Sequence, residues 1–270
     1  MLSVGKVGFL GGGKMAQAMM KGLINAGLVE AKSIVASVHP QDLPNIKCVK
    51  DLGAEAVVEN LPVVKQSDVV FITVKPDVVP QALSEVKSAS ANKLFLSIAM
   101  GITVADLRKN LHENSRIIRI MSNIPITVQA GCSAFVRGSN VTDEDAKLTQ
   151  QLLKSVGHCE EVNEKLLDVI TALAGSGPAF IFVLIESLAD GAVKMGMPRD
   201  VAYRFASQTV LGAAQMVRDS KEHPGKLKDD VTSPGGSTAA GLNYLDKMNF
   251  RAAAAGAVEM ATLRSKGIIS

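Results

Sequence analysis

The stretch from Val7 to Leu23 reads VGFLGGGKMAQAMMKGL and joins a short apolar run to a helical pattern. Its glycines and one alanine follow the spacing Gly11-x-Gly13-x-x-Ala16. In this spacing the first glycine permits a tight turn, the second lets the backbone approach a diphosphate, and the alanine keeps the helix close to the sheet. Unpaired N–H groups at the start of the helix bind anions. The stretch therefore predicts a dinucleotide site at a strand-to-helix turn.

Apolar runs of strand length recur through the first 162 residues, and helical patterns such as Lys14–Ala26 separate them. The runs are Val4–Leu10, Ser33–Ser37, Val69–Val74, Leu94–Ile98 and Arg116–Met121. Continuous apolar runs are typical of parallel strands that are covered on both faces. The alternation of strands and helices predicts an α/β fold, a Rossmann-like doubly wound sheet, with residues 1–162 as the dinucleotide-binding domain.

From residue 163 to residue 270 the strand patterns stop, and an all-helical domain is predicted. Its helical patterns are Glu164–Ala174, Pro178–Met195, Arg199–Arg218, Ser237–Lys247 and Phe250–Lys266. The most apolar run, Ala179–Val193, is interrupted by Glu186 and Asp190, which form one polar stripe with Lys194. This pattern favours a subunit interface over a membrane span, so the domain is interpreted as a dimerisation domain, with an ordinary helical-bundle core as the alternative.

Composition excludes several classes of partner. Net charge is +3, and neither half of the chain is a basic arm, so neither nucleic acid nor a membrane surface is expected as a partner. Aromatic residues make up 4% and Trp is absent, which removes the usual stacking platforms for single-stranded nucleic acid.

Cysteine usage and the N-terminal pattern bear on the compartment. Cys48, Cys132 and Cys159 form no C-x-x-C pair and are interpreted as reduced thiols, with no metal site. Residues 1–30 lack the ordered regions of a secretory signal. We expect a cytosolic protein, with the mitochondrion as the alternative.

The end of the second predicted strand indicates which dinucleotide is preferred. Ser37, Val38 and His39 follow the apolar run, and no acid occurs between Ala31 and Gln41. A carboxylate there binds the ribose diol of NAD and repels the 2′-phosphate of NADP, so its absence favours NADPH over NADH. Ser37 and His39 are candidates to donate hydrogen bonds to the nucleotide.

Two stretches in the helical half carry a family resemblance, namely ALAGSGPAF at Ala172–Phe180 and LKDDVTSPGGSTAAGLNYLD at Leu227–Asp246. With the opening VGFLGGGKMA, the VKP at 74–76 and the SNIP at 122–125, the whole chain resembles the Δ1-pyrroline-5-carboxylate reductases. The SPGGST at 233–238 is their most specific motif. Members of the family reduce the cyclic imine to L-proline with NADPH or NADH, the last step of proline biosynthesis. Their C-terminal helices interlock into homodimers, which often assemble into homodecamers.

The resemblance also implies site residues. The implied cofactor contacts, together with the strand-end residues Ser37 and Val38, are Leu10, Gly11, Gly12, Gly13, Lys14, Met15, Asn60, Val74, Lys75, Pro76, Ile98, Ala99, Met100 and Asp230. The implied substrate contacts are Glu164, Gly235, Gly236, Ser237 and Thr238, with Thr238 as the catalytic residue. Two positions depart from the family pattern. Val38 replaces a Ser that would help to hold a 2′-phosphate, and Asp230 replaces a common Asn.

The chemistry fits these residues. Hydride transfer to a C=N bond needs neither a metal nor a nucleophile, because the protein only has to position two rings and hold a carboxylate. We expect Gly235 and Gly236 to expose amides that bind this carboxylate. The hydroxyl of Ser237 or Thr238 would then meet the ring nitrogen, and one of the two would also cap the helix.

Two other functions stay open at this stage. A β-hydroxyacid dehydrogenase or an imine reductase has a related architecture and typically uses a lysine on the first helix of the helical domain, where Lys194 lies near the end. The other alternative is a non-catalytic NAD(P)-sensing protein. The complete SPGGST argues against a sensor, which has no need of a second site.

Overall fold

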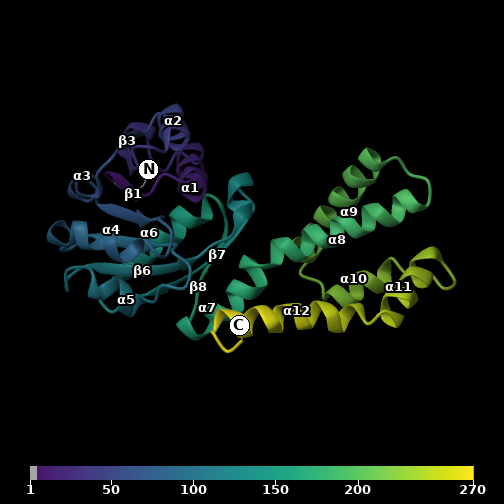
Figure 1. Cartoon of the computed structure of the whole chain (residues 1–270). Coiled ribbons are helices and arrows are strands. Elements are labelled where there is room, and N and C mark those ends of the chain that lie inside the picture. Colours follow the sequence, from purple (N-terminus) through teal and green to yellow (C-terminus); the bar gives the residue numbers. More distant parts are fainter. Residues whose placement is uncertain (1–4, 270) are drawn as a thin grey trace. The chain divides into compact units, whose positions relative to one another are not determined.

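The computed structural model describes residues 5–269, and they form two compact units that divide between Gly175 and Ser176 (Figure 1). The first unit holds a sheet with helices, and the second is helical. Both confirm the predicted fold class. Val4, the first residue of the first predicted strand, lies outside the described residues.

The sheet of the first unit has eight strands in the order β3-β2-β1-β4-β5-β6-β7-β8. The strands are β1 Val7–Leu10, β2 Ile34–Ser37, β3 Glu55–Val57, β4 Val69–Ile72, β5 Leu94–Ser97, β6 Arg116–Met121, β7 Gly131–Arg137 and β8 Gly157–Glu161. Strand β7 is antiparallel to β6, and the other neighbouring pairs are parallel. The strand order reverses at β1, which lies between β2 and β4. In doubly wound sheets the ligand crevice opens beyond the carboxyl ends of the strands at this reversal.

Helices cover both faces of the sheet. They are α1 Lys14–Asn25, α2 Leu43–Asp51, α3 Asn60–Gln66, α4 Val79–Val86, α5 Val104–Lys109 and α6 Asp143–Lys154, with short 3-10 helices at Ala31–Ser33, Lys87–Ala89 and Ile124–Val128. Strand β1 is completely buried, and its side chains alternate between two cores. Val7 and Phe9 join the core under α1, α2 and α6, whereas Leu10 joins the core under α3, α4 and α5. Phe9 stacks on Phe71 of β4, with 4.8 Å between the ring centroids.

The chain leaves β8 through three kinds of helical turn. A 3-10 turn at Glu164–Leu166 leads into α7, Leu167–Ile170, and then into a π-helical segment, Thr171–Gly175. Leu167 is buried with Met121 of β6. This packing assigns the turns to the first unit, which ends at Gly175, whereas the sequence prediction set the domain boundary after residue 162.

The second unit is built from five α-helices within the described residues. They are α8 Gly177–Lys194, α9 Arg199–Ser220, α10 Pro224–Asp230, α11 Ser237–Lys247 and α12 Phe250–Ser265. A small core of Ala189, Ala202 and Ala206 joins α8 to α9, and Asp190 of the predicted polar stripe forms an ion pair with Arg199.

Most apolar side chains of the second unit are not covered by their own chain. Phe182 and Phe205 are 61% and 65% exposed. Neither α11 nor α12 buries a single residue. Exposed apolar surface of this extent marks an interaction face, in agreement with the predicted dimerisation domain.

Candidate active site

The turn between β1 and α1 has the geometry that its glycines predicted. Gly11 has a φ of +101°, and a Cβ at this position would lie 3.0 Å from Cγ1 of Val74. Only glycine fits such a close approach to the end of β4. Gly13 is the N-cap of α1, and a Cβ there would meet no atom within 4 Å. The N-terminus of α1 therefore opens onto free space, where backbone N–H groups can bind an anion.

Side chains from neighbouring strands fix this turn. Oγ of Ser37 accepts a hydrogen bond from the Gly11 amide (3.1 Å) and donates to Oδ1 of Asn60 (2.6 Å). Oγ1 of Thr73 donates to the Gly11 carbonyl at 2.7 Å. Both backbone groups of Gly11 are therefore engaged within the protein. The Ser37 hydroxyl also lies 3.4 Å from the Phe9 carbonyl, so in this structure it donates within the protein and supports the turn.

A second tie runs from the turn toward α2. Nε2 of Gln17 donates to the carbonyl of Gly12 (2.8 Å) and to Oδ1 of Asn45 (2.7 Å). Nδ2 of Asn45 in turn donates to Oδ2 of Asp42 (2.7 Å). The N–H groups left for a diphosphate are those of Gly12, Gly13 and the first turn of α1.

A cleft of about 580 Å³ opens above this turn at the carboxyl ends of β1, β2 and β4. The predicted cofactor residues that line it are Gly11, Gly12, Gly13, Ser37, Val38, Asn60, Val74 and Lys75. Among the other predicted cofactor residues, four from the glycine turn and the end of β4 do not line it. Leu10 is fully buried beneath the turn, Lys14 faces another groove beside Lys21, Met15 packs partly against the core, and Pro76 is exposed outside the cleft. Lys14 and Met15 still lie in the first turn of α1, where their backbone N–H groups belong to the open N-terminus.

The part of the cleft beyond β2 contains an acid that the sequence analysis missed. Asp42 lies one residue past the segment that was searched, and it caps the N-terminus of α2. Its carboxylate accepts from the amide side chain and, at 3.4 Å, from the backbone N–H of Asn45. The Val38 side chain is 5% exposed, because it packs under Gly12. Val38 therefore supports the turn more than it presents a side chain to the cleft.

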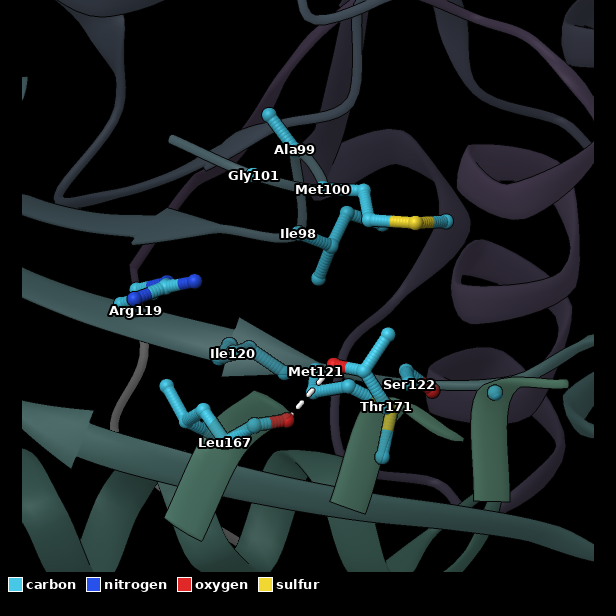
Figure 2. A pocket seen from close by; sticks show the side chains of 11 residues that line it. Ile98, Ala99, Met100, Gly101, Arg119, Ile120, Met121, Ser122, Leu167 and Thr171 are labelled. Atoms are coloured by element: carbon cyan, nitrogen blue, oxygen red, sulfur yellow. Dashed lines mark hydrogen bonds between the residues drawn. The ribbon is translucent and has the colours of Figure 1, made fainter. Parts of the chain in front are cut away.

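A second, smaller cavity of about 40 Å³ lies at the carboxyl ends of β5 and β6. Figure 2 shows Ile98 and Met100 on one wall and Leu167 and Thr171 on the opposite wall. Ile98, Ala99 and Met100 were predicted to contact the cofactor, and the structure places them together here. They do not line the larger cleft.

Arg119 also lines this cavity, and the sequence analysis missed it. Its side chain is only 15% exposed, and Nη1 forms an ion pair of 3.0 Å with Oε1 of Glu164. Glu164, a predicted substrate residue, does not line the cavity and is 45% exposed. The signal available in the sequence was one arginine in the middle of the buried run RIIRIM.

The SPGGST motif forms a tight turn in the second unit. Gly235 has a φ of +69°, and the Gly236 amide donates to the Ser233 carbonyl at 3.1 Å. Pro234 and Gly235 occupy the two central positions, as in a type II turn. The expectation that both glycine amides are free is therefore wrong for Gly236.

The hydroxyl cap expected at α11 is also wrong. The N-cap is Gly236, and no side chain caps the helix. Ser237 and Thr238 are the first two helical residues and are exposed, and over residues 5–269 neither hydroxyl has a hydrogen-bond partner. The free N–H groups at this end are those of Ser237, Thr238 and Ala239. Asp230, at the end of α10, forms an ion pair with Lys226.

Neither Cys132 nor Cys159 is suited to act as a nucleophile. Burial raises the pKa of the Cys159 thiol to about 12, and burial also raises the pKa of Cys132. Thiolate formation is disfavoured at both positions. Within the part of the chain that the structure describes, no group of three or more His, Cys, Asp and Glu side chains is placed to hold a metal ion.

A doubly wound sheet with an open glycine turn at its reversal defines a dinucleotide-binding protein, here with a helical unit attached. Comparison with known families agrees. Residues 6–101 match a family model described as NADP oxidoreductase, coenzyme F420-dependent. Residues 164–268 match the model for pyrroline-5-carboxylate reductase dimerisation.

Relatives extend the match over almost the whole chain. A pyrroline-5-carboxylate reductase of Arabidopsis thaliana is 44% identical over 262 residues, which are 97% of this chain and 94% of the relative. The structure of the Coxiella burnetii enzyme matches 99% of this chain and 100% of its own, with a TM-score of 0.92 and 31% identity. The Plasmodium falciparum enzyme, solved with NADP bound, matches 100% of both chains with a TM-score of 0.87 and 31% identity. This chain belongs to the pyrroline-5-carboxylate reductase family.

Proposed function

We infer that this protein reduces Δ1-pyrroline-5-carboxylate to L-proline with a hydride from NADPH or NADH. The observation that carries this inference is the 44% identity, over nearly the full length of both chains, with a relative of that name. The glycine turn supplies a dinucleotide site, and the SPGGST turn supplies a second site with free N–H groups and hydroxyls. A protein that only sensed the dinucleotide would need one of the two.

The residues of the first unit fit a dinucleotide. The bound cofactor supplies the hydride. Gly12, Gly13 and the first turn of α1 hold its diphosphate, because an added Cβ at Gly13 meets nothing and the helix dipole favours negative charge. Val74 and Lys75 line the same cleft at the end of β4. The loop Ile98–Met100 lies beyond the next strand in the sheet, β5, and suits the nicotinamide end.

The N-terminus of α11 suits the substrate. The carboxylate of the substrate is held by the backbone N–H groups of Ser237, Thr238 and Ala239, and the hydroxyl of Ser237 assists them. The Thr238 hydroxyl binds the ring nitrogen and orients the imine. The protonated ring carries its own proton, so the hydride adds to the carbon of the C=N bond and the nitrogen keeps the proton. Thr238 therefore works without giving up its proton.

NADPH is the preferred cofactor in this proposal. The carboxylate of Asp42 is the acid nearest to the end of β2 in the sequence, and it is engaged by Asn45. An acid that binds the ribose diol must point into the cleft with its oxygens free.

The helical unit is proposed to pair with a second copy, and the pairs to assemble into decamers. By length and composition alone, the helical segment Glu164–Lys194 could cross a membrane. However, the Asp190–Arg199 ion pair and the dimerisation model over residues 164–268 favour a protein partner. We further propose that the protein works in the cytosol, without nucleic-acid or membrane partners. Sedimentation at micromolar concentration should detect a dimer or a larger assembly, and a folded, active monomer would contradict the pairing.

The activity is tested by incubating the protein with pyrroline-5-carboxylate and NADPH and measuring proline by amino-acid analysis. A matched reaction uses 1-pyrroline, which has the same ring without the carboxylate. Proline formation with little turnover of 1-pyrroline is expected, because the α11 N-terminus recognises the carboxylate. Equal turnover of both rings would favour a general imine reductase. NADPH binding without proline formation would favour a sensor.

A further inference from the structure

The carbonyl of Ala174 lacks its usual helical donor. In an α-helix this oxygen accepts from the N–H four residues later, and that residue is Pro178, which has no N–H. The next amide, that of Ala179, donates to the Ser176 carbonyl at 3.0 Å. A partly buried carbonyl without a donor is costly, so a partner from outside the helix is expected.

Asn123 supplies that partner. Its Nδ2 donates to the Ala174 carbonyl at 3.0 Å, and its Oδ1 accepts from the Cys132 amide at 2.9 Å. The two bonds agree on which end of the side-chain amide is nitrogen. The residue is 8% exposed and follows β6 by two positions. One side chain therefore ties the end of β6, the start of β7 and the π-helical segment together, all within the first unit.

The tied segment forms a wall of the smaller cavity. Thr171 and Gly175, at the two ends of the π-helical segment, line the cavity, and so does Ser122, the residue before Asn123 (Figure 2). Asn123 itself does not line it. π-Helical turns occur often at functional sites. In a cavity of about 40 Å³, a small displacement of this wall changes its shape substantially.

We propose that Asn123 is a positioning residue for the reduction. By donating to the carbonyl that Pro178 leaves unpaired, it sets the distance between Thr171 and the opposite loop, Ile98–Gly101. The reacting atoms of the nicotinamide ring and the imine must lie about 3–3.5 Å apart, and this geometry must be held to within about 0.5 Å. This role rests on the proposed function, and it adds a residue that touches neither ring.

Asn123→Asp tests the role, because the change keeps an acceptor for the Cys132 amide and replaces the donor to Ala174 with a carboxylate oxygen that repels this carbonyl. We expect kcat/KM for pyrroline-5-carboxylate to fall about 10- to 100-fold, since displacement by 1 Å can cost that much. The Kd for NADPH should stay within about twofold, because the larger cleft at the glycine turn is built by other residues.

Pro178→Ala provides the matched rescue. Alanine at 178 supplies an N–H four residues after Ala174, which is the position from which an α-helix provides the donor to this carbonyl. Pro178→Ala alone should retain wild-type activity, and Asn123→Asp with Pro178→Ala should regain most of the lost kcat/KM. A purely structural role for Asn123 would instead lower Tm and NADPH binding together, without rescue at 178.

Several results would overturn the proposal. They are wild-type kcat/KM in Asn123→Asp, a loss that Pro178→Ala leaves unchanged, or a parallel loss of NADPH binding. If Asn123→Asp does not fold, Asn123→Gln keeps the amide but displaces it by one methylene, and wild-type kcat/KM in that variant would overturn the role. No proline formation by the wild-type protein would overturn the proposed function and this role with it, whereas an unaffected variant overturns the role alone.

Discussion

The two glycine turns of this protein precede helices in a similar way but are supported differently. The turn Gly11–Gly13 before α1 is held by Ser37, Thr73 and Gln17 from surrounding elements. The turn Ser233–Gly236 before α11 is closed by its own backbone hydrogen bond. Helix α1 buries six of its residues, whereas α11 buries none. The proposed nucleotide turn is therefore held by its own domain, whereas the proposed substrate turn is closed by its own backbone.

The largest difference is expected from matched alanine substitutions at Gly11 and Gly235, the positive-φ glycines of the two turns. Gly11→Ala combines backbone strain with contacts near 3.0 Å to the end of β4, so about 2–4 kcal/mol of stability should be lost, and NADPH binding with it. Gly235→Ala meets no atom within 4 Å and should cost only the strain, about 1–2 kcal/mol. Thermal unfolding and NADPH titration check both. Equal losses of stability would mean that the two turns are supported alike.

Thr238→Ala should lower kcat/KM about 10- to 150-fold, because a hydrogen bond of roughly 1.5–3 kcal/mol to a charged group is lost. Since Thr238 does not cap α11, its Tm, its NADPH binding and its assembly should stay unchanged. Thr238→Ser keeps the hydroxyl and should retain most activity. If the alanine variant is fully active, only the backbone amides and Ser237 remain as proposed substrate contacts in this turn.

Cofactor preference sharpens the account of the nucleotide turn. Initial rates at equal concentration should be higher with NADPH than with NADH. Asp42→Asn keeps an oxygen to cap α2 and removes a negative charge from the cleft, so the KM for NADPH should fall about two- to fivefold while that for NADH changes less. Higher rates with NADH in the wild type would show that Asp42 acts on the ribose diol despite its bonds to Asn45.

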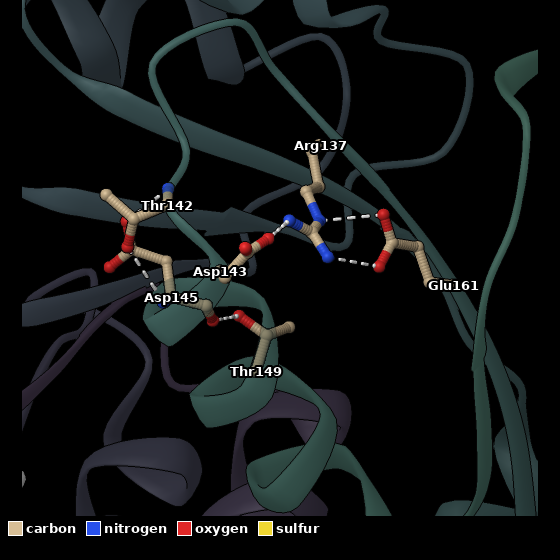
Figure 3. Close-up of polar contacts among 6 residues, drawn as sticks. All are labelled: Arg137, Thr142, Asp143, Asp145, Thr149 and Glu161. Atoms are coloured by element: carbon tan, nitrogen blue, oxygen red, sulfur yellow. Dashed lines mark hydrogen bonds and ion pairs between the residues drawn. The ribbon is translucent and has the colours of Figure 1, made fainter.

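The smallest effect is expected at an ion cluster on the first unit. Figure 3 shows Arg137 of β7 between Asp143 of α6 and Glu161 of β8, with ion-pair distances of 2.5 and 2.7 Å. The hydrogen bond from Arg137 lowers the pKa of Asp143. A lowered pKa stabilises the fold above the unfolded pKa, near 4, and this contribution disappears as the pH falls through the folded pKa. Asp143→Asn should therefore lower Tm slightly at pH 7, and this deficit should shrink as the pH falls below about 4. A deficit that does not change with pH would contradict the electrostatic origin.

The sequence predicted β1, β2, β4, β5 and β6, because these strands are continuous apolar runs. It missed β3, β7 and β8. Strand β7 is buried from Ser133 to Val136 as well, but Gly131, Cys132 and Ser133 leave its apolar run short. In β8 only Cys159 is buried, and Glu160 and Glu161 face solvent, so no apolar run marks this edge strand. The Glu164–Ala174 pattern did predict a helical segment, but its 3-10 and π-helical turns depend on packing and on Asn123, which lies far away in the sequence.

At the site, local motifs were predictable and their partners were not. The glycine spacing predicted the turn at α1, but Ser37 and Thr73 reach it only in the folded sheet. Ser237 and Thr238 were expected to cap α11. They lie at the first two helical positions instead. The side chain that accepts hydrogen bonds from the N–H groups of the first helical turn belongs to the N-cap residue, which precedes these positions. Arg119 was hidden because its ion pair with Glu164 forms across 45 residues.

Because α8 and α9 expose apolar faces, we expect the stability of the protein to depend on its concentration. With a second copy as their proposed partner, pairing is a bimolecular equilibrium. Each tenfold dilution then removes about 1.4 kcal/mol of stability per mole of dimer. Tm should therefore rise with protein concentration, and an assay at nanomolar enzyme should lose activity with time that an assay at micromolar enzyme keeps. The specific activities of two preparations can therefore be compared only at the same protein concentration.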